Sequence, residues 1–257
     1  MITEEQRLRT LARYEKHRRI WDANELVRTL YREWYQRIAA RLPDPRIGPF
    51  VELGSGPGFA REFIPGLQLS DVVPAPWLDH QISADDLPFA DQTVGALVLF
   101  DVLHHLADPG QFFSEAARVL AVGGRVVLCE PYLSPLSFPF YRWLHDEPVV
   151  LGVDPLAPQG FGASGKDPFD SNQAIPTLAF DREEGRRALA SRFPNLVLGP
   201  IERLAGLSYV VSGGFSRAPL LPLNIWRAVR RVEAILPAWV YRLIGFRMLV
   251  SLEKMRS

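Results

Sequence analysis

The chain has 257 residues, of which 47% are hydrophobic, and its 29 basic and 29 acidic residues give no net charge. Its length and apolar content favour one elaborated domain over two typical domains with linkers. A single cysteine excludes an intrachain disulfide framework, and the lack of an uncharged run of 18 apolar residues argues against a membrane span. The first ten residues lack the apolar core of a signal peptide, so we expect a cytoplasmic protein.

The first predicted elements are helical. Residues 3–41 contain neither proline nor glycine, and they place apolar residues at helical spacing. The segment PDPRIGP, residues 43–49, interrupts this pattern. We therefore divide the chain into an N-terminal helical region, 1–46, and a main domain, 47–257.

The main domain begins with short apolar runs that alternate with helical patterns. The predicted strands are GPFVEL (48–53), LQLSDVV (67–73), VGALVLF (94–100) and GGRVVLCE (123–130). An amphipathic helix, PGQFFSEAARVL, lies between the last two runs. Strand, helix and strand at this spacing indicate the α/β class: an open, mostly parallel sheet with helices on both faces.

The amino-acid composition changes after residue 130. Residues 131–180 are rich in proline and aromatic residues but remain apolar, so we expect an ordered insertion that caps the substrate site. A helix over 181–193 and a strand within 196–204 are predicted next. An apolar and basic stretch, 213–247, precedes a last strand, RMLVSLEKM.

A glycine-rich loop follows the first predicted strand, in the stretch FVELGSGPGF. Gly54, Gly56 and Gly58 lie beyond the carboxyl end of that strand, where open parallel sheets bind their ligands. Glycine tolerates positive φ and lets the backbone approach a ligand closely. Alone, this pattern also suits a nicotinamide-binding fold or a simple tight turn.

Five blocks in order resemble the class I S-adenosylmethionine-dependent methyltransferases of the UbiE-type, small-molecule subgroup. They are FVELGSGPG, Asp71 at the end of the second apolar run, SADDLPFAD, VLFDVLHHLADP and EAARVLAVGGRVVLCEP, within about residues 50–131. The resemblance implies a Rossmann-like fold, S-adenosylmethionine as cofactor and methyl transfer as the activity. A nicotinamide-dependent oxidoreductase and a non-catalytic S-adenosylmethionine-binding protein on the same fold are the alternatives.

The resemblance also implies a set of cofactor-binding residues. It assigns the ribose to Asp71 and places the backbone N–H of Leu87 beside the adenine. The full set comprises Glu52, Gly54, Ser55, Gly56, Gly58, Asp71, Asp85, Asp86, Leu87, Phe100, Asp101 and His105. Residues 47–110 carry nine acids against one base, Arg61, which suits a sulfonium cation. We expect Tyr14 and His17 of the N-terminal helices either to close over the cofactor or simply to pack.

One feature departs from the family pattern. The usual helix between the second and third strands is missing, because few residues separate Asp71 from Asp85. This weakens the assignment of Asp71 to the ribose. Pro74, Pro76 and Trp77 are the alternative wall of the pocket.

Methyl transfer from a sulfonium mainly requires orientation of the acceptor, and a base is needed only for a hydroxyl or an unactivated carbon. Our candidates for catalytic residues are His145 and His104. Asp146 would raise the basicity of His145 if the two side chains touch. We expect no metal, because no second cluster supports His104, His105 and Asp108 as ligands.

The acceptor is predicted to be a small, partly apolar molecule, lipid-linked or a secondary metabolite. The reason is that the insertion, 131–180, and the stretch 213–247 are both rich in aromatic and apolar residues. No nucleic-acid partner is expected, since the late basic residues belong to no recognised nucleic-acid module. The basic amphipathic segment within 217–247 suits either peripheral membrane contact or a helix that covers the sheet. A homodimer through this apolar stretch is a further hypothesis.

Overall fold

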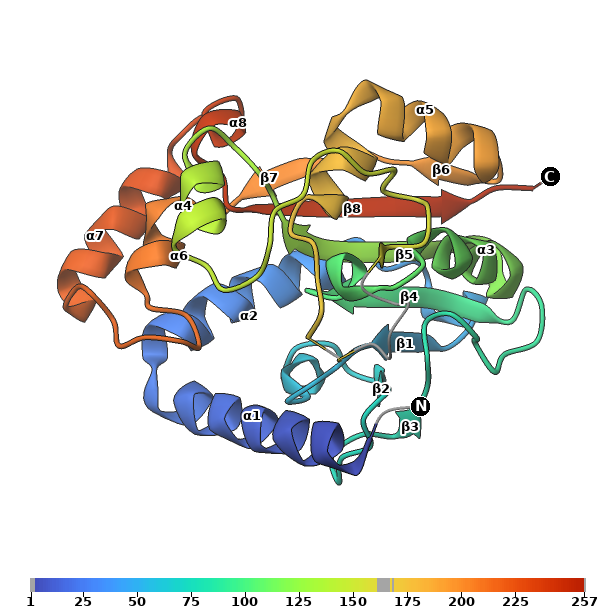
Figure 1. Ribbon diagram of the computed structural model, residues 1–257, viewed down its shortest axis with the longest axis horizontal. Coiled ribbons are helices and arrows are strands. Elements are labelled where there is room, and N and C mark those ends of the chain that lie inside the picture. Colours follow the sequence, from blue (N-terminus) through green and yellow to red (C-terminus); the bar gives the residue numbers. More distant parts are fainter. Residues whose placement is uncertain (1–2, 161–166, 168, 257) are drawn as a thin grey trace.

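The computed structural model describes residues 3–160, 167 and 169–256. Eight strands form one sheet that runs through the whole molecule (Figure 1). The strands are β1 (Phe50–Leu53), β2 (Gln68–Asp71), β3 (His80–Gln81), β4 (Val94–Phe100), β5 (Leu120–Pro131), β6 (Leu196–Leu198), β7 (Glu202–Leu204) and β8 (Arg247–Lys254). Their order is β3-β2-β1-β4-β5-β8-β6, and β7 pairs with β8 beside β6.

The first five strands pair with one another in parallel, whereas β8 is antiparallel to β5, β6 and β7. The carboxyl ends of β1, β2, β4 and β5 therefore lie at one edge of the sheet. The predicted α/β class with an open, mostly parallel sheet is confirmed. The strand predicted within 196–204 is instead two short strands, β6 and β7, both paired with β8.

The N-terminal helical region consists of α1 (Glu4–Ala23) and α2 (Glu25–Ala39). Asn24 separates the two helices, and its side chain accepts hydrogen bonds from the first turn of α2. The apolar positions Leu30, Trp34 and Ile38 recur every four residues and are buried on one side of α2. They join the core on one face of the sheet, together with Val98 of β4.

The opposite face of the sheet is covered by α3 (Pro109–Val119) and α5 (Glu183–Arg192). Asp108 caps α3, and Pro109 occupies the first helical position, where a missing N–H costs nothing. Alternate residues of β4 point to opposite faces, so Leu97 and Leu99 pack with α3 while Val98 and Phe100 pack with α2. The sheet is therefore buried on both faces, as its continuous apolar runs indicate.

The remaining elements lie beyond the carboxyl ends of the strands or connect them. They are the helices α4 (Ser137–Trp143), α6 (Leu207–Val211), α7 (Leu223–Ala234) and α8 (Tyr241–Ile244), the π-helix η5 (Thr177–Asp181), and the 3-10 turns η1 (Pro45–Ile47), η2 (Phe59–Glu62) and η3 (Leu103–His105). Figure 1 shows α4 beside α6, α7 and α8 at one end of the molecule. Within the predicted insertion, residues 161–166 and 168 lie outside the described part of the chain. Among the helices of the described residues, none is long and apolar enough to cross a membrane.

The expected departure from the family pattern is present. No helix lies between β2 and β3, and the intervening residues 72–79, all of which are described, form a compact turn. The crossover after β1 contains only the short turn η2. This edge of the sheet is therefore thin, and α1 lies alongside it (Figure 1).

Candidate functional site

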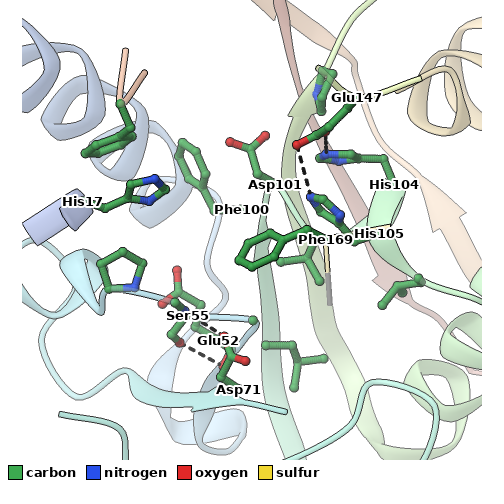
Figure 2. A pocket seen from close by; sticks show the side chains of 18 of the residues that line it. His17, Glu52, Ser55, Asp71, Phe100, Asp101, His104, His105, Glu147 and Phe169 are labelled. Carbon is green, nitrogen blue, oxygen red and sulfur yellow. Dashed lines mark hydrogen bonds and ion pairs between the residues drawn. The ribbon is translucent and has the colours of Figure 1, made fainter. Parts of the chain in front are cut away.

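A cavity of about 680 Å³ lies at the carboxyl ends of the parallel strands. This volume is within the range of about 300–1,000 Å³ that is usual for small-molecule sites. We call one part of it the glycine-loop side, formed by Glu52, Gly54, Ser55, Gly56 and Asp71. We call the other part the histidine side, formed by His104, His105, His145, Glu147 and Gln173. Figure 2 shows these two sides with Phe100 and Asp101 between them.

The loop after β1 has the backbone conformation that its glycines permit. Gly54 and Gly56 have φ values of +68° and +48°, in the left-handed region that side chains disfavour. A Cβ added at Gly54 would lie 2.6 Å from a methyl carbon of Val102. The loop is held from outside the cavity, where the indole N–H of Trp77 donates to the carbonyl of Gly56 at 2.8 Å.

Glu52, one residue before the end of β1, has a carboxylate that is almost completely buried. The residue is 1% exposed, yet it lines the cavity. Burial raises its pKa to about 7, although a hydrogen bond with Ser55 opposes the shift. Its Oε2 atom has no hydrogen-bond partner among the described residues. A buried acceptor of this kind suits a ligand that brings a cation or a hydrogen-bond donor.

Asp71 lies at the end of β2, as predicted, but the protein already uses much of its hydrogen-bonding capacity. Its Oδ2 accepts from the backbone N–H of Gly56 at 2.9 Å and from the hydroxyl of Tyr14 at 3.0 Å. Its Oδ1 accepts from the N–H of Val73 at 3.0 Å. A carboxylate offers about four acceptor positions. One position therefore remains for a ligand, unless Tyr14 moves.

Helix α1 forms a wall of the cavity. Tyr14 and His17 line it, and the ring of His17 stacks on Phe215 with centroids 4.7 Å apart. Arg18, one residue further along, donates to the carbonyl of Pro57 in the glycine loop at 2.7 Å. The N-terminal helices thus touch both the loop and the C-terminal segment that carries Phe215.

Several predicted cofactor residues do not reach the cavity. The N–H of Leu87 donates to the Glu115 carboxylate at 2.9 Å, and its side chain is buried in the core. Asp86 donates its N–H to Ser83 and does not line the cavity, whereas its neighbour Asp85 does.

Two further expectations about the loop region need correction. Gly58 starts η2 and bonds back to Ser55, outside the cavity lining. The alternative wall of Pro74, Pro76 and Trp77 is also wrong, because none of the three lines the cavity. Trp77 instead supports the loop from behind.

The histidine side is organised around His104. Its Nδ1 lies 2.7 Å from Oε2 of Glu130, and its Nε2 lies 3.3 Å from Oε2 of Glu147. Oε1 of Glu130 accepts the N–H groups of Val102 and Leu103, each at 2.8 Å. Burial disfavours a charged ring, but the two glutamates outweigh it and raise the pKa of His104 to about 10.

His105 and Gln173 also lie next to the Glu147 carboxylate. The Nε2 of His105 lies 4.0 Å from Oε1 of Glu147, and its Nδ1 lies 3.1 Å from the backbone carbonyl of Asp170. Burial lowers the pKa of His105 to about 3, and the neighbouring His104 adds to the shift. The amide N of Gln173 donates to Glu147, while its Oε1 has no hydrogen-bond partner among the described residues.

His145 lines the cavity, but its surroundings differ from those expected of a base. Burial lowers its pKa, and this outweighs the attraction of Glu147. Its Nδ1 accepts the backbone N–H of Glu147 at 3.3 Å, so the neutral ring carries its proton on Nε2. Asp146 is exposed and is not among the groups that shift the pKa of His145, so the contact on which the predicted rise in basicity depended is not seen. His145 therefore presents a hydrogen-bond donor to any contact made through Nε2.

Asp101 forms an ion pair that crosses the cavity floor. Its partner is Arg247, the first residue of β8, whose guanidinium also lies 5.1 Å from the ring centroid of Tyr209. The cation is buried among Trp34, Phe100 and Tyr209, and its pairing with Asp101 offsets the cost of burial. Asp101 does not cap the turn that follows it, because its carboxylate faces Arg247.

The structure brings together residues that the sequence did not single out. Glu130 had a detectable signal, because a carboxylate at the end of the apolar run RVVLCE must be paired when buried. No sequence signal marked Glu147, Gln173 or Arg247. The first two lie in the insertion, which has no periodicity, and Arg247 follows the break in pattern at Gly245. Conversely, Asp108 caps α3 and takes no part in the histidine side.

The sequence of residues 51–128 matches the profile of a family described as a methyltransferase domain. These residues therefore carry the sequence pattern of a methyltransferase domain. The predicted family resemblance is therefore confirmed for the part of the chain that carries the glycine loop, Asp71 and the two histidines after β4.

Curated relatives and a solved structure resemble this methyltransferase domain. The demethylmenaquinone methyltransferase of Tropheryma whipplei (strain Twist) is 39% identical over 64 residues, 24% of this chain and 26% of the relative. The enzyme of the same name from Streptomyces avermitilis is 36% identical over 83 residues, 32% of this chain and 35% of the relative. The chain thus matches only about a quarter to a third of the length of these relatives.

A solved complex between the Haloferax volcanii Trm112 methyltransferase activator and a methyltransferase contains a chain with a similar fold. Its TM-score is 0.52 at 16% identity, and the alignment covers 100% of both chains. This likeness supports the fold of the methyltransferase domain and its surrounding elements.

Proposed function

We propose that the protein transfers a methyl group from S-adenosylmethionine to a small, partly apolar acceptor. The observation that carries the proposal is Glu52, a buried carboxylate with a free acceptor atom beside a loop of positive-φ glycines. A cofactor with a permanent positive charge and several N–H and O–H donors fits these groups. When bound, it supplies a methyl group that is already activated for transfer.

The glycine-loop side is the proposed cofactor site. The groups available to the cofactor are Glu52, the backbone of Gly54 to Gly56, and the remaining acceptor position of Asp71. Asp85, Phe100 and Asp101 also line the cavity, whereas His105 lies on the histidine side. Gly58, Asp86 and Leu87 lie outside this set, because they do not line the cavity.

The histidine side is the proposed acceptor site. Tyr141, Phe169 and Tyr209 supply aromatic surface in this cavity, and Phe215 adds more beside His17 of α1. Such walls exclude water and fix the orientation of an apolar molecule, which is the main task of the protein in this reaction. The name of the curated relatives, demethylmenaquinone methyltransferase, supports a small-molecule acceptor of this kind.

The catalytic roles of the two predicted histidines differ. His104 has both ring nitrogens engaged by glutamates, so we propose that it positions Glu147 and does not itself take a proton from the acceptor. His145 is the better candidate for direct contact with the acceptor, as a hydrogen-bond donor through Nε2.

An apolar acceptor also agrees with the exposed surface beside the cavity. Trp143 of α4 is 71% exposed, and Ile235 and Trp239, between α7 and α8, are 81% and 63% exposed. The start of α4 and α8 are joined by a hydrogen bond from Leu136 to Leu243. We propose that this surface makes peripheral contact with an anionic membrane, since Arg231 and Arg242 belong to the same helices.

Liposome flotation tests the membrane contact. The wild-type protein is expected to float with vesicles that contain anionic lipid, and an Ile235→Asp, Trp239→Ser variant is expected to remain in the soluble fraction. A Val197→Asp variant, exposed on β6, is the control. If the wild type does not float but sediments as a dimer that the double variant abolishes, the surface is a homodimer interface instead.

Calorimetric titration with S-adenosylmethionine, and with NADH as comparison, tests the proposed function. Saturable binding of S-adenosylmethionine is expected, and Gly56→Arg should abolish it because that side chain would fill the loop beside Tyr14. Gly152→Arg is the matched control, since nothing lies within 4 Å of its Cβ position. Binding of NADH alone would support an oxidoreductase, and binding of S-adenosylmethionine without turnover of any acceptor would support a non-catalytic protein.

A further inference from the structure

We propose that His104, His105 and Glu147 bind a divalent transition-metal ion on the histidine side of the cavity. Nε2 of His104 lies 3.3 Å from one oxygen of Glu147, and Nε2 of His105 lies 4.0 Å from the other. One ligand atom from each residue lies within 4.8 Å of the others. Ligands bound at about 2.0–2.2 Å around a tetrahedral or octahedral ion are about 3.0–3.5 Å apart, so small side-chain movements complete the site.

The two histidines are already oriented as metal ligands. His104 donates its Nδ1–H to Glu130, and His105 donates its Nδ1–H to the backbone carbonyl of Asp170. In each ring the other nitrogen, Nε2, then faces Glu147 (Figure 2). Metal-binding histidines almost always have such an acceptor behind them, either a carboxylate or a backbone carbonyl. Glu130 is itself held by two backbone N–H groups, so its position is fixed.

The charge of the cluster matches a dication. Glu130 is fully buried and Glu147 is largely buried, and both lie against the imidazole of His104. The nearby Asp101 is already neutralised by Arg247. With neutral histidines, the two glutamates leave two negative charges in a site of low solvent access. A divalent ion balances them and takes the place of the proton that Nε2 of His104 otherwise shares with Glu147, which leaves to the solvent.

The ligand types indicate the kind of ion. Two imidazoles and one carboxylate suit Zn²⁺, Fe²⁺, Co²⁺ or Ni²⁺ better than Mg²⁺ or Ca²⁺, which prefer oxygen. Three protein ligands leave further coordination positions on the cavity side. There the unpartnered Oε1 of Gln173 can accept a hydrogen bond from a metal-bound water.

The proposed ion also indicates how an acceptor binds. An acceptor with a hydroxyl, enol or carboxylate oxygen would replace the metal-bound water and be fixed beside the activated methyl group. This last step rests on the proposed function. The metal site itself does not, and it can be tested without cofactor or acceptor.

Metal binding is best measured on the full chain after treatment with a chelator and dialysis. Titration with Co²⁺ is expected to give visible absorption bands that saturate at one ion per chain, and calorimetry with Zn²⁺ should give the same stoichiometry. His105→Ala and Glu147→Gln are each expected to weaken binding by at least 100-fold. Glu130→Gln, which alters only the support of His104, should weaken it by about 10–100-fold.

Matched control variants are available elsewhere on the surface. His80→Ala removes an exposed histidine on β3, and Glu184→Gln removes an exposed carboxylate of α5. Both are expected to bind metal like the wild type. Circular dichroism and thermal unfolding identify any site variant that fails to fold, and His105→Asn then replaces His105→Ala.

The outcomes separate this proposal from the proposed function. If the wild type binds neither Zn²⁺ nor Co²⁺ saturably, or binds them equally well in folded His105 and Glu147 variants, the metal site is wrong. Failure to bind S-adenosylmethionine, measured separately on the metal-free chain, would instead overturn the proposed function and leave the metal site standing.

Discussion

The two sides of the cavity are built in different ways. The glycine-loop side comes from a short local segment, in which β1, its loop and the end of β2 supply nearly every group. The histidine side takes His104 and His105 from η3 and its other groups from the insertion, and Glu130 at the end of β5 supports it. The contacts that join its different segments link residues 26 to 65 positions apart in the chain. A local motif can therefore define the first side, whereas the second exists only in the folded chain.

The strongest test of this contrast removes Arg247, the cation of β8 that pairs with Asp101 between the two sides. Arg247→Met is expected to lower the free energy of unfolding in urea by about 3 kcal/mol or more, because it leaves the Asp101 carboxylate without its partner. The hydrogen bonds described for Asp71 and the glycine loop do not involve Arg247, so the folded fraction should still bind S-adenosylmethionine, weakened only by the displacement of Asp101.

Two further variants of the ion pair sharpen this result. Asp101→Asn combined with Arg247→Met should recover part of the loss, since no uncompensated charge remains. Arg187→Met, which removes an exposed pair on α5, should unfold like the wild type. If Arg247→Met alone unfolds with the same free energy as the wild type, the Asp101–Arg247 ion pair does not stabilise the fold.

The second test addresses the glycine-loop side through pH. The folded pKa of Glu52, about 7, lies above its ordinary value of 4.5. The folded state therefore holds this proton more tightly than the unfolded state, and the resulting stabilisation is present below pH 4.5 and is lost as pH rises to 7. Relative to Glu52→Gln, the ligand-free wild type should lose up to about 3 kcal/mol of stability over that interval and then remain constant.

Urea unfolding of both proteins at intervals from pH 4.5 to pH 8 measures this difference. Bound S-adenosylmethionine should reduce it, because a cation near Glu52 favours the ionised carboxylate. If the difference in unfolding free energy between the two proteins does not change with pH, burial does not raise the pKa of Glu52.

The smallest expected effect concerns the contact between α1 and the glycine loop. Tyr14→Phe removes one of three donors to Asp71 and should cost about 1–2 kcal/mol of unfolding free energy. The control is Tyr132→Phe, whose hydroxyl contacts are long, at 3.4 and 3.5 Å, and which should change stability little. Equal effects of the two substitutions would indicate that the Tyr14 hydroxyl contributes nothing specific.

The fold could be predicted well from the sequence, because β1, β2, β4 and β5 of the parallel sheet each correspond to a short apolar run in the sequence. The four parallel core strands, α3 and the missing helix after β2 all follow from apolar runs and breakers. The position of Asn24 as a cap between two helices was not expected, although Asn is a common cap. The split of the predicted strand into β6 and β7 depends on pairing with β8, which no local pattern reveals.

The candidate site was predictable only in part, for the same physical reason. The placement of Glu52, Gly54, Gly56 and Asp71 follows from one strand end and one loop. Leu87 was misplaced because its N–H is taken by Glu115, a residue 28 positions away on α3. Glu147 could not be predicted as a site residue, because its role depends on His104 and His105, which only folding brings next to it.

The position of Arg247 at the start of β8 has a consequence for how the protein is made. A ribosome synthesises Asp101 146 residues before it synthesises the cation that neutralises it. During that interval β5 has an unpaired edge, since its partner β8 has not yet emerged, and such edges invite association with other chains. The nascent chain therefore carries an open strand edge and an uncompensated acid until β8 has been synthesised.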